Sequence, residues 1–499
     1  MLISKRLTIA LLPLLSAGCV VGPGQPPLTT LPLAAEPLAK TKTITPDTPD
    51  KWWSLYQDPA LNQAVEQALS NNRDLRVAAA NLLATQALLR ETDAQKLPST
   101  SFSAKGGYGS SLDDQIEAAL GQSDNIRTGS RYSAGIDLQW ELDLFGRLRS
   151  RSSAAQADTE SAQAEEDGVR VWVAAETTRA WLSACSYGQR IGIAQRALAQ
   201  VEQGQQITEA LYKSGAGVAL DVVRAKGLVY QTRADLPVLK AKRQRVLAEL
   251  AVLMGRLPAN PPAQALACLK PPTLAHRGLP DNDGLALLRR RPDVREAQQQ
   301  LAAATANIRV ATTDLYPRIS LGANMLSSAH QPEYWGNSGA TVWSIGPLIS
   351  WSFPNVTQAR ARIAQAGAKE SAALAHFDGT ILAALKEVQV SLASYDSALQ
   401  RQKLLQQAAE NSRQALKLST LAYQDGAATA LDYLDNQRND VAVQSALARA
   451  NTRVIEAQVT LFKALGGGWQ QAPSVVLPVP QRSKTASSIL FPPVFKRES

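Results

Sequence analysis

Apolar and polar residues alternate strictly between residues 132 and 142. The apolar positions of this stretch are Tyr132, Ala134, Ile136, Leu138, Trp140 and Leu142. A period of two predicts a β-strand with one apolar and one polar face. Tyr132 and Trp140 are eight residues apart, which is about 26 Å in a strand and close to the ~25 Å apolar band of an outer-membrane strand. The pattern therefore predicts a membrane-spanning strand with an aromatic residue at each interface.

This strand pattern occurs twice in the chain. Trp343 and Trp351 lie 211 positions after Tyr132 and Trp140, within an alternating stretch that reaches Phe353. Helical segments with apolar residues seven apart, 74–97 and 293–316, precede the two strands. Each ends at a proline and leads into a further alternating stretch, near residues 102–108 and 319–325. One supersecondary unit has been duplicated, and the chain is expected to form two β-hairpins with four strands.

Helical periodicity follows each hairpin for an unusual length. Residues 147–213 and 356–424 predict helices of 67 and 69 residues, each about 100 Å long. Apolar residues at alternating spacings of three and four predict coiled-coil contacts with neighbouring helices. Each long helix is expected to end at a glycine, Gly215 or Gly426, in the left-handed conformation.

The chain then returns in helices predicted over 217–255 and 429–466. Residues at the two turns keep the offset of 211, namely Tyr212 with Tyr423, Gly215 with Gly426, and Asp221 with Asp432. The shorter helices together nearly match a long one, so two of them can flank it end to end. The proline-rich segment 257–283 is expected to fold around the point where they meet.

The N-terminus has the features of a secretory leader. Lys5 and Arg6 precede an apolar run that is too short to span a bilayer as a helix. The four residues that end in Cys19 resemble a bacterial lipobox, in which the cysteine is acylated. An ordinary leader with an incidental cysteine is the alternative. Val20 stands where an aspartate would resemble an inner-membrane retention signal, so the outer membrane is the expected destination.

Composition argues against several other functions. The formal net charge is +9, but the basic residues are dispersed rather than clustered, which does not predict a nucleic-acid site. The chain contains no nucleophile elbow, phosphate loop or metal-ligand cluster, so no enzyme activity, metal or cofactor is expected beyond a covalent lipid on Cys19. Cys185 and Cys268 are expected as free thiols in preference to a bridge.

Four strands cannot close a barrel, and an open sheet in lipid leaves unpaired edges that cost several kcal/mol per group. Two chains would give eight strands with a filled interior, and three would give twelve with a water-filled bore. The polar row of the predicted strands favours three. Symmetry would continue the pore through the long helices into the periplasm.

In their order along the chain, several motifs resemble those of the outer-membrane efflux factors, the TolC-like channel-tunnels, within the lipoprotein branch that serves drug-efflux pumps. These motifs are Cys19-Val20-Val21-Gly22-Pro23, Trp52-Trp53 with Asp58-Pro59, Arg291-Pro292-Asp293, the two Tyr-x-x-Gly turns and Ala430-Leu431-Asp432. The resemblance implies a lipid-anchored homotrimer in the outer membrane of a Gram-negative bacterium. It also implies a mixed α and β fold with a twelve-strand barrel and a twelve-helix tunnel.

The same resemblance implies the function and the partners. Such a channel passively conducts drugs or other small molecules from an inner-membrane transporter of the RND type and a periplasmic adaptor. A tunnel for type I protein secretion is the nearest alternative, followed by a structural coiled-coil lipoprotein. The sequence departs from the family's pattern at Ser16 of the lipobox, at Gln25, and in a longer loop before Arg291.

A periplasmic gate is expected at the second turn. In similar efflux factors, a leucine and an aspartate at the positions of Leu431 and Asp435 form the constriction. Arg224 lies 211 positions before Asp435, so a bridge between neighbouring hairpins would hold the tip shut. A solvated helix face without a latch is the alternative.

These observations predict an internally duplicated chain in six parts. They are a signal peptide (1–18), a lipidated tether (19–50), a first repeat (51–256), a linker (257–283), a second repeat (284–468) and a disordered tail (469–499).

Overall fold

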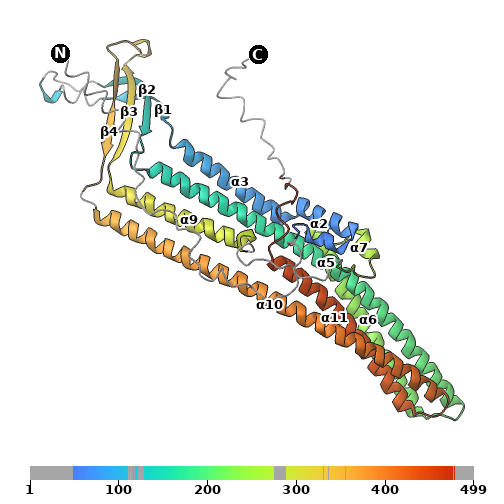
Figure 1. Ribbon diagram of the computed structural model, residues 1–499. Helices are drawn as coiled ribbons and strands as arrows, with labels where there is room; N and C mark the ends of the chain where they lie inside the picture. Colours follow the sequence, from blue (N-terminus) through green and yellow to red (C-terminus); the bar gives the residue numbers. More distant parts are fainter. Residues whose placement is uncertain are drawn as a thin grey trace, which may run out of the picture. The chain divides into compact units, whose positions relative to one another are not determined.

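The computed structural model describes residues 49–110, 116, 118–121, 128–274, 288–329, 331–334, 336–353, 356–475 and 477. The predicted leader, Cys19 and nearly all of the tether lie outside these residues, as does most of the tail. The described elements are, in chain order, η4 (Trp52–Tyr56), α2 (Pro59–Asn71), α3 (Arg73–Ala94), β1 (Ser99–Gly109), β2 (Gly129–Glu141), α5 (Arg147–Lys213), α6 (Ala219–Leu253), α7 (Ala263–Ala267), α9 (Pro292–Thr312), η5 (Thr313–Leu315), β3 (Arg318–Ala329), η6 (Pro332–Tyr334), β4 (Thr341–Ser350), α10 (Val356–Gln424) and α11 (Ala430–Ala464) (Figure 1).

The chain divides into two compact units. The first, which we call the strand unit, contains Asn81–Gly168 and Asn282–Gln389, and the second, the helix unit, contains Thr43–Ala80, Val169–Asp281 and Val390–Ser499. The strand unit holds all the described strands. Three helices, α3, α5 and α10, contribute residues to both units.

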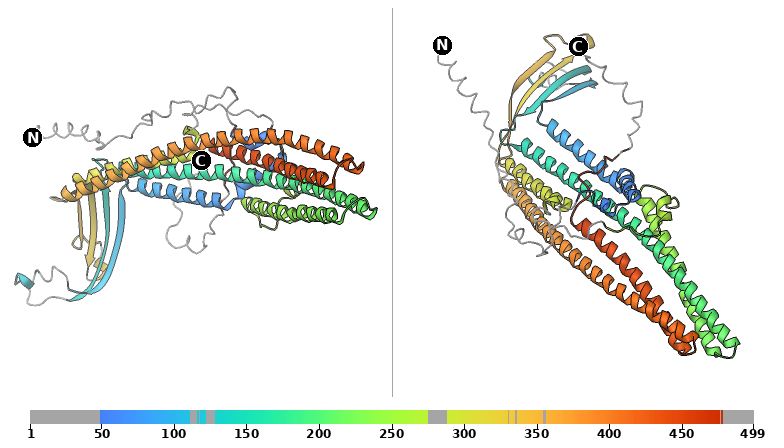
Figure 2. Two further views of the ribbon diagram at one scale, coloured as in Figure 1. Left: turned by 90° about the horizontal axis from the view of Figure 1, so that it is seen from below. Right: turned by 45° about the vertical axis from the view of Figure 1, so that its right-hand side comes forward.

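The four strands form one antiparallel sheet in the order β1-β2-β3-β4, and Figure 2 shows them side by side. Both predicted hairpins are present, and pairing between β2 and β3 joins them. Trp351 lies one residue beyond β4, although the alternation predicted a strand through Phe353. The pairing stops because Ser350 is opposite Arg318, the first residue of β3, and Pro317 before it has no amide hydrogen to donate.

The two long helices have the bounds that periodicity predicts. α5 runs from Arg147 to Lys213 and α10 from Val356 to Gln424. The return helices α6 and α11 each contain 35 residues. Among the described residues, no helix combines the length and the apolar character needed to cross a membrane.

Helix packing in the strand unit follows the predicted heptads. Val294 and Leu301 of α9 are buried in one cluster with Phe377 and Ile381 of α10. Ala297 of α9 and Ala384 of α10 belong to the same cluster. The seven-residue spacing of α9 therefore marks its contact face with α10.

Ion pairs support the same packing. The Arg291 guanidinium donates to Asp293 and to Glu387, each at 2.7 Å, which ties the start of α9 to α10. Arg295 donates to the buried Asp167 of α5 at 3.0 Å. The start of α9 is thus fixed against both long helices within the strand unit.

A buried aromatic cluster organises the start of the helix unit. Trp52, Trp53 and Tyr56 of η4 are almost fully buried, and Trp52 stacks on Phe462 of α11 with ring centroids 4.9 Å apart. Tyr56 Oη donates to Gln458 Oε1 at 3.2 Å. These contacts fasten the segment before α2 to α11.

The end of α6 meets the start of α3, as the helix lengths predict. Asn72 Nδ2 donates to the Leu253 carbonyl at 3.1 Å, and Asn72 Oδ1 accepts the Leu75 amide at 3.1 Å. Asn72 therefore joins the C-terminal end of α6 to the first turn of α3.

The linker carries a disulfide that corrects the expectation of free thiols. Cys268, directly after α7, is bonded to Cys185 of α5. Both residues belong to the helix unit. The prediction was wrong because spacing along the sequence carries no information on a contact between residues so far apart.

Candidate functional site

One face of the sheet is apolar because the strand register aligns residues of like character. Phe102 pairs with Ile136, Ile136 with Met325, and Met325 with Trp343. All four side chains are exposed. Paired apolar side chains on the surface of a sheet form a continuous row, and this row suits contact with lipid.

The neighbouring row, which faces the other way, is polar. Ser101 pairs with Asp137, Asp137 with Asn324, and Asn324 with Ser344. Ser344 Oγ donates to Asn324 Oδ1 at 2.9 Å across the pair. Successive residues of a strand point to opposite faces, so the sheet separates an apolar side from a more polar one. The more polar side also carries the exposed pair Leu326 and Val342.

The predicted interface aromatics lie toward the strand ends. Trp140 Nε1 donates to the Lys96 carbonyl at 3.0 Å near one end of β2. Tyr132, toward the other end, places its ring over Gly106, where an added Cβ would be 3.4 Å from Tyr132 Cδ1. Trp343 and Trp351 are both exposed. Their placement at membrane interfaces stays a prediction.

The turns after α5 and α10 have matching backbones. Gly215 has a φ of +80° and Gly426 a φ of +72°, in the left-handed region. The Gly217 amide donates to the Leu211 carbonyl at 3.0 Å, and the equivalent Ala428 amide donates to the Ala422 carbonyl at 3.1 Å. The chain reverses by one mechanism in both repeats, in which the left-handed residue lets later amides satisfy the last helical carbonyls.

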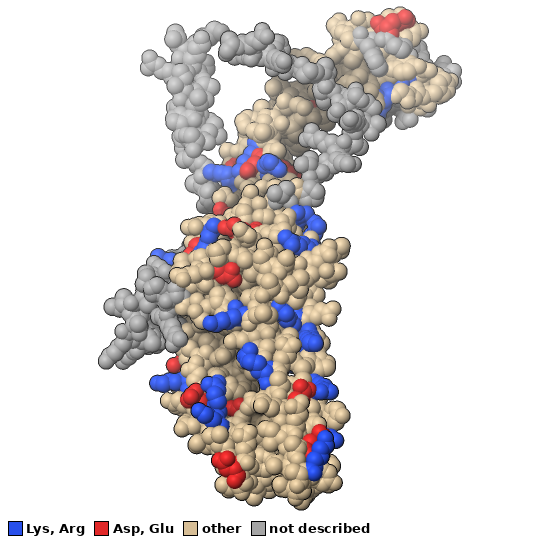
Figure 3. Space-filling view, turned by 90° about the vertical axis from the view of Figure 1, so that its right-hand side faces the viewer, with Lys and Arg blue, Asp and Glu red and all other residues tan. Residues whose placement is uncertain are grey.

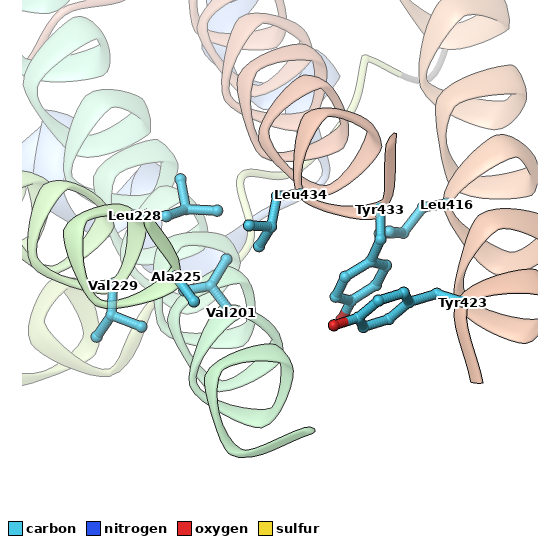
Figure 4. Packing of buried hydrophobic residues seen from close by; sticks show 8 residues of the cluster. All are labelled: Val201, Ala225, Leu228, Val229, Leu416, Tyr423, Tyr433 and Leu434. Atoms are coloured by element: carbon cyan, nitrogen blue, oxygen red, sulfur yellow. The ribbon is translucent and has the colours of Figure 1, made fainter. Parts of the chain in front are cut away.

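The side chains at the two turns differ. Tyr423 is 8% exposed and stacks on Tyr433 with ring centroids 5.0 Å apart, whereas Tyr212 is 49% exposed. Burial raises the pKa of Tyr433 above its ordinary value, and the nearby Tyr423 raises it further by a smaller amount. Figure 4 shows this tyrosine pair within the tip cluster, which comprises Val201, Ala225, Leu228, Val229, Leu416, Tyr423, Tyr433 and Leu434.

The two predicted first-turn aspartates also differ. Thr429 Oγ1 accepts the Asp432 amide at 3.2 Å, and Asp432 Oδ2 accepts the Thr429 amide at 3.3 Å, which forms a capping box at the start of α11. The equivalent Val218 of α6 makes no side-chain cap, and Asp221 pairs with Arg224 at 3.6 Å.

The expected gate residues are exposed near the start of their helices. Leu431 is 49% exposed, and Asp435 accepts from Arg438 at 3.0 Å on the same helix. Arg224 is paired with Asp221 along α6. Within one chain the structure thus places Arg224 and Asp435 in separate ion pairs, each along its own helix.

A buried polar network near the tip was missed by sequence reasoning. Ser412 Oγ of α10 donates to Asp440 Oδ1 at 2.9 Å, and Gln437 Nε2 donates to the Gln200 carbonyl at 3.0 Å. Asp440 and Gln437 are 5% and 1% exposed. Their spacing from Tyr433, four and then three, is the same contact periodicity as the apolar seams. That spacing is the signal that marks them as interior positions.

Gly204 of α5 makes this network possible. A Cβ at that position would lie 2.7 Å from Gln437 Nε2 and 2.8 Å from Tyr433 Oη. A glycine is required because any side chain would displace both polar groups. The tip is therefore tightly packed inside the chain, although its gate candidates are exposed.

Charged side chains of both signs are mixed on the surface. On the face shown in Figure 3, lysine and arginine side chains are scattered, with aspartate and glutamate between them. Among the described residues, no group of three or more histidine, cysteine, aspartate or glutamate side chains is arranged to hold a metal ion. The geometry instead describes a two-faced sheet joined to long packed helices.

Comparison with known proteins agrees with this architecture. The family model described as outer membrane efflux protein matches residues 64–256 and 286–467, one segment in each repeat. The chain belongs to the outer membrane efflux protein family. The predicted resemblance is confirmed, and the chain is an outer-membrane component of an efflux system.

Several members of the outer membrane efflux protein family are similar over most of the chain. Outer membrane protein OprJ of Pseudomonas aeruginosa is 31% identical over 429 residues, which is 85% of this chain and 88% of OprJ. The toluene efflux pump outer membrane protein TtgI of Pseudomonas putida is 30% identical over 419 residues, 83% of this chain and 86% of TtgI.

A solved structure confirms the fold. The outer-membrane channel OprN is 34% identical, with a TM-score of 0.81, over 91% of this chain and 100% of that chain. The family is one of channel and transport proteins.

Proposed function

We propose that three copies of this chain close one twelve-strand barrel and form the outer-membrane channel of a tripartite efflux pump. The observation that carries the proposal is the sheet itself. It has one apolar and one polar face, and among the described strands β1 and β4 are edges that pair on one side only. Lipid tolerates no unpaired edge, so the edges of neighbouring copies pair with each other.

The native mass tests this assembly. Protein in mild detergent should have a mass of about 160 kDa, three times the precursor's 53.5 kDa, and reconstituted trimers should conduct ions in planar bilayers. Charge reversal on the polar face, Asp137→Lys, should change ion selectivity, whereas Asp137→Glu, which keeps the charge, serves as the reference. A folded monomer in lipid contradicts the assembly.

Small molecules are the proposed cargo, delivered by a periplasmic adaptor and an inner-membrane transporter of the RND type. Two relatives support export of small molecules, since TtgI belongs to a toluene efflux pump and OpmQ of Pseudomonas putida is a pyoverdine export protein. These cargoes differ chemically, so cargo choice is assigned to the transporter. Deletion of this gene should raise susceptibility to the cargo of that transporter, and complementation should restore export.

Lipidation of Cys19 is part of the proposal. The probable outer membrane lipoprotein SilC of Salmonella typhimurium is 28% identical over 422 residues. Labelled palmitate should enter the wild type but not Cys19→Ala. The variant should stay in the membrane fraction because the barrel alone retains it. A soluble Cys19→Ala protein would contradict the proposal that a barrel holds the chain in the membrane. It would not contradict the lipidation of Cys19.

The gate is proposed at Leu431, Asp435 and Arg224. Threefold symmetry gathers three copies of each exposed side chain at the periplasmic mouth. The Asp435–Arg438 pair is more than half exposed on both sides, so it contributes about 0.2–1 kcal/mol and does not prevent Asp435 from changing partners.

Conductance distinguishes a gate from a solvated face. Asp435→Ala and Arg224→Ala should raise single-channel conductance, and Arg438→Ala should not, because it leaves Asp435 free to meet a neighbour. Arg413→Ala, at another exposed same-helix pair, serves as the control. If Leu431→Ala and Asp435→Ala trimers both conduct like the wild type, the constriction lies elsewhere.

A further inference from the structure

Both long helices begin with arginines that do not suit a helix start. Arg149 and Arg151 lie near the start of α5, and Arg360 and Arg362 occupy the matching positions of α10, 211 residues later. Neither helix has an acidic residue in its first turn. A helix N-terminus carries partial positive charge and favours anions. In α5 the Asp143 carboxylate offsets part of this cost, since it accepts the Leu148 and Arg149 amides. The duplicated cations still disfavour the helix starts and call for a further explanation.

The surrounding junction between strands and helices has an excess of positive charge. The chain carries four carboxylates and seven cations where these strands and helices begin or end, namely Asp93, Glu141, Asp143 and Asp314, and Lys96, Arg147, Arg149, Arg151, Arg318, Arg360 and Arg362. Asp314 accepts from both Arg318, at 3.4 Å, and Arg362, at 2.8 Å. One carboxylate is thus shared between two arginines. All of these groups belong to the strand unit.

Arg151 and Arg360 remain outside the ion pairs found among the described residues, and both are exposed. Partial burial lowers the pKa of Arg151, and the positive charges of Arg147 and Arg318 lower it further. The charged groups around Arg151 therefore include cations. Each is the fifth residue of its helix, although the two fall two positions short of the 211-residue offset. Both nevertheless present a free guanidinium beside the same strand ends.

Exposed aromatic side chains lie at these strand ends. Trp140 is 37%, Trp351 54% and Phe353 68% exposed, and the Trp351 and Phe353 ring centroids are 5.1 Å apart. Figure 1 shows α5 and α10 beginning where β2 and β4 end. Exposed aromatic rings settle at the headgroup level of a bilayer. The arginines one short turn further along therefore lie close to the lipid phosphates.

We propose that the arginines at the starts of α5 and α10, chiefly Arg151 and Arg360, form a binding surface for the headgroups of anionic phospholipids in the periplasm-facing leaflet. The guanidinium group bonds phosphate oxygens in a bidentate manner and is more weakly hydrated than an ammonium. The duplication repeats the surface in each half of the chain. The inference rests on the proposed insertion of the sheet into the membrane.

Tryptophan quenching tests the proposal on the full-length trimer in vesicles. Trimers are reconstituted in phosphatidylcholine that contains increasing fractions of brominated phosphatidylglycerol, with brominated phosphatidylcholine as the reference, and the ratio of the two quenching curves gives lipid preference. The wild type should prefer phosphatidylglycerol. Each surface cation contributes about a fivefold preference for anionic lipid, so Arg151→Gln/Arg360→Gln should lose several-fold of it.

Two matched variants complete the experiment. Arg151→Lys/Arg360→Lys keeps the charge and should retain most of the preference. Arg413→Gln/Arg453→Gln removes two exposed, ion-paired arginines from α10 and α11 and should retain all of it. High salt should weaken the wild-type preference because it screens exposed charges.

Three outcomes overturn the proposal. If the double glutamine variant keeps the wild-type preference, the arginines do not bind lipid. If inorganic phosphate at constant ionic strength abolishes the preference, the surface binds free anions. If neither brominated lipid quenches tryptophan fluorescence, the sheet is not in the bilayer, and the proposed channel fails together with this inference.

Discussion

Cys185 and Cys268 are joined by a disulfide although 83 positions separate them in the sequence. Gly188, nearly one turn along α5 from Cys185, admits the linker backbone, since a Cβ there would lie 2.5 Å from the Cys268 carbonyl oxygen. Arg243 of α6 donates to the carbonyls of Leu266 and Cys268, at 2.7 Å and 3.0 Å. The disulfide thus fastens a linker segment that non-covalent contacts already hold.

Removal of the disulfide should destabilise the helix unit. In the chain-entropy model, closing an 83-residue loop restricts the unfolded chain by about 4.5 kcal/mol. Cys185→Ser/Cys268→Ser should therefore lower the thermal midpoint of the detergent-solubilised trimer, and reduction of the wild type should lower it to the same value. Cys19 stays intact in both. Two free thiols in unreduced, unfolded wild-type protein, found by alkylation, contradict the pairing.

Replacing Asp58 should lower the thermal midpoint by more than the loss of an ordinary helix cap does. Its Oδ1 accepts the Ala60 and Leu61 amides at 2.9 Å and 3.2 Å, and its Oδ2 accepts Trp181 Nε1 at 3.0 Å. Asp58→Ala loses the cap, about 1 kcal/mol, and leaves a buried indole N–H unpaired, about 1–3 kcal/mol. The thermal midpoint should fall accordingly.

Asp58→Asn separates the two contributions of Asp58. Asparagine caps helices as well as aspartate does, but its amide group cannot accept from the indole while its oxygen faces the cap. Its thermal midpoint should lie between those of the wild type and Asp58→Ala. Equal midpoints for Asp58→Ala and the wild type would show that neither bond contributes.

Long periodic segments of this chain could be predicted from sequence because many residues specify each one. The bounds of α5 and α10 and the presence of four strands required no knowledge of the rest of the chain. Contacts between distant segments were not predictable in this way. The Trp181–Asp58 bond and the Cys185–Cys268 disulfide depend on how helices lie side by side, which no spacing within either segment records.

At the tip, too, local sequence rules explained some residues but not those whose partners lie on another helix. The aspartates of the first turns were interpretable from local rules, because a cap involves residues three apart. The burial of Asp440 was not interpreted, since aspartate is mostly exposed in proteins and its partner Ser412 lies on another helix. The difference in burial between Tyr212 and Tyr423 likewise depends on tertiary packing, because both follow the same local motif.

Alkaline pH should destabilise the helix unit through Tyr56. Burial raises the pKa of Tyr56 far above its ordinary value of 10.0, and the nearby Tyr395 adds a smaller contribution in the same direction. An unfolded chain releases this proton near pH 10, whereas the folded chain keeps it. The stabilisation is therefore fully present below about pH 10 and is lost as the pH rises above that value.

Tyr56→Phe isolates this contribution. The variant should be less stable than the wild type at pH 8, because it leaves Gln458 Oε1 without the tyrosine donor, at a cost of about 1 kcal/mol. Its thermal midpoint should then fall less between pH 9 and pH 11. The exposed Tyr230→Phe provides the control. Parallel pH curves for the wild type and Tyr56→Phe would assign the alkaline loss to other groups.

Only one of the two return helices begins with a capping box. Substitutions that exchange valine and threonine at the two cap positions should therefore have opposite effects on the stability of the helix starts. Val218 and Thr429 occupy equivalent positions, both with extended backbones, at φ −113° and ψ 151° and at φ −77° and ψ 155°. Each is followed three residues later by an aspartate, Asp221 or Asp432. Val218→Thr therefore supplies the one missing member of a capping box and should stabilise the start of α6 by about 0.5–1 kcal/mol, while Thr429→Val should destabilise the start of α11 by a similar amount.

Hydrogen exchange of the first-turn amides measures both effects locally, with slower exchange expected at Asp221 and faster exchange at Asp432. If exchange at Asp221 does not slow in Val218→Thr, its ion pair with Arg224 holds the carboxylate away from the cap. Val218→Thr/Arg224→Ala should then restore the effect.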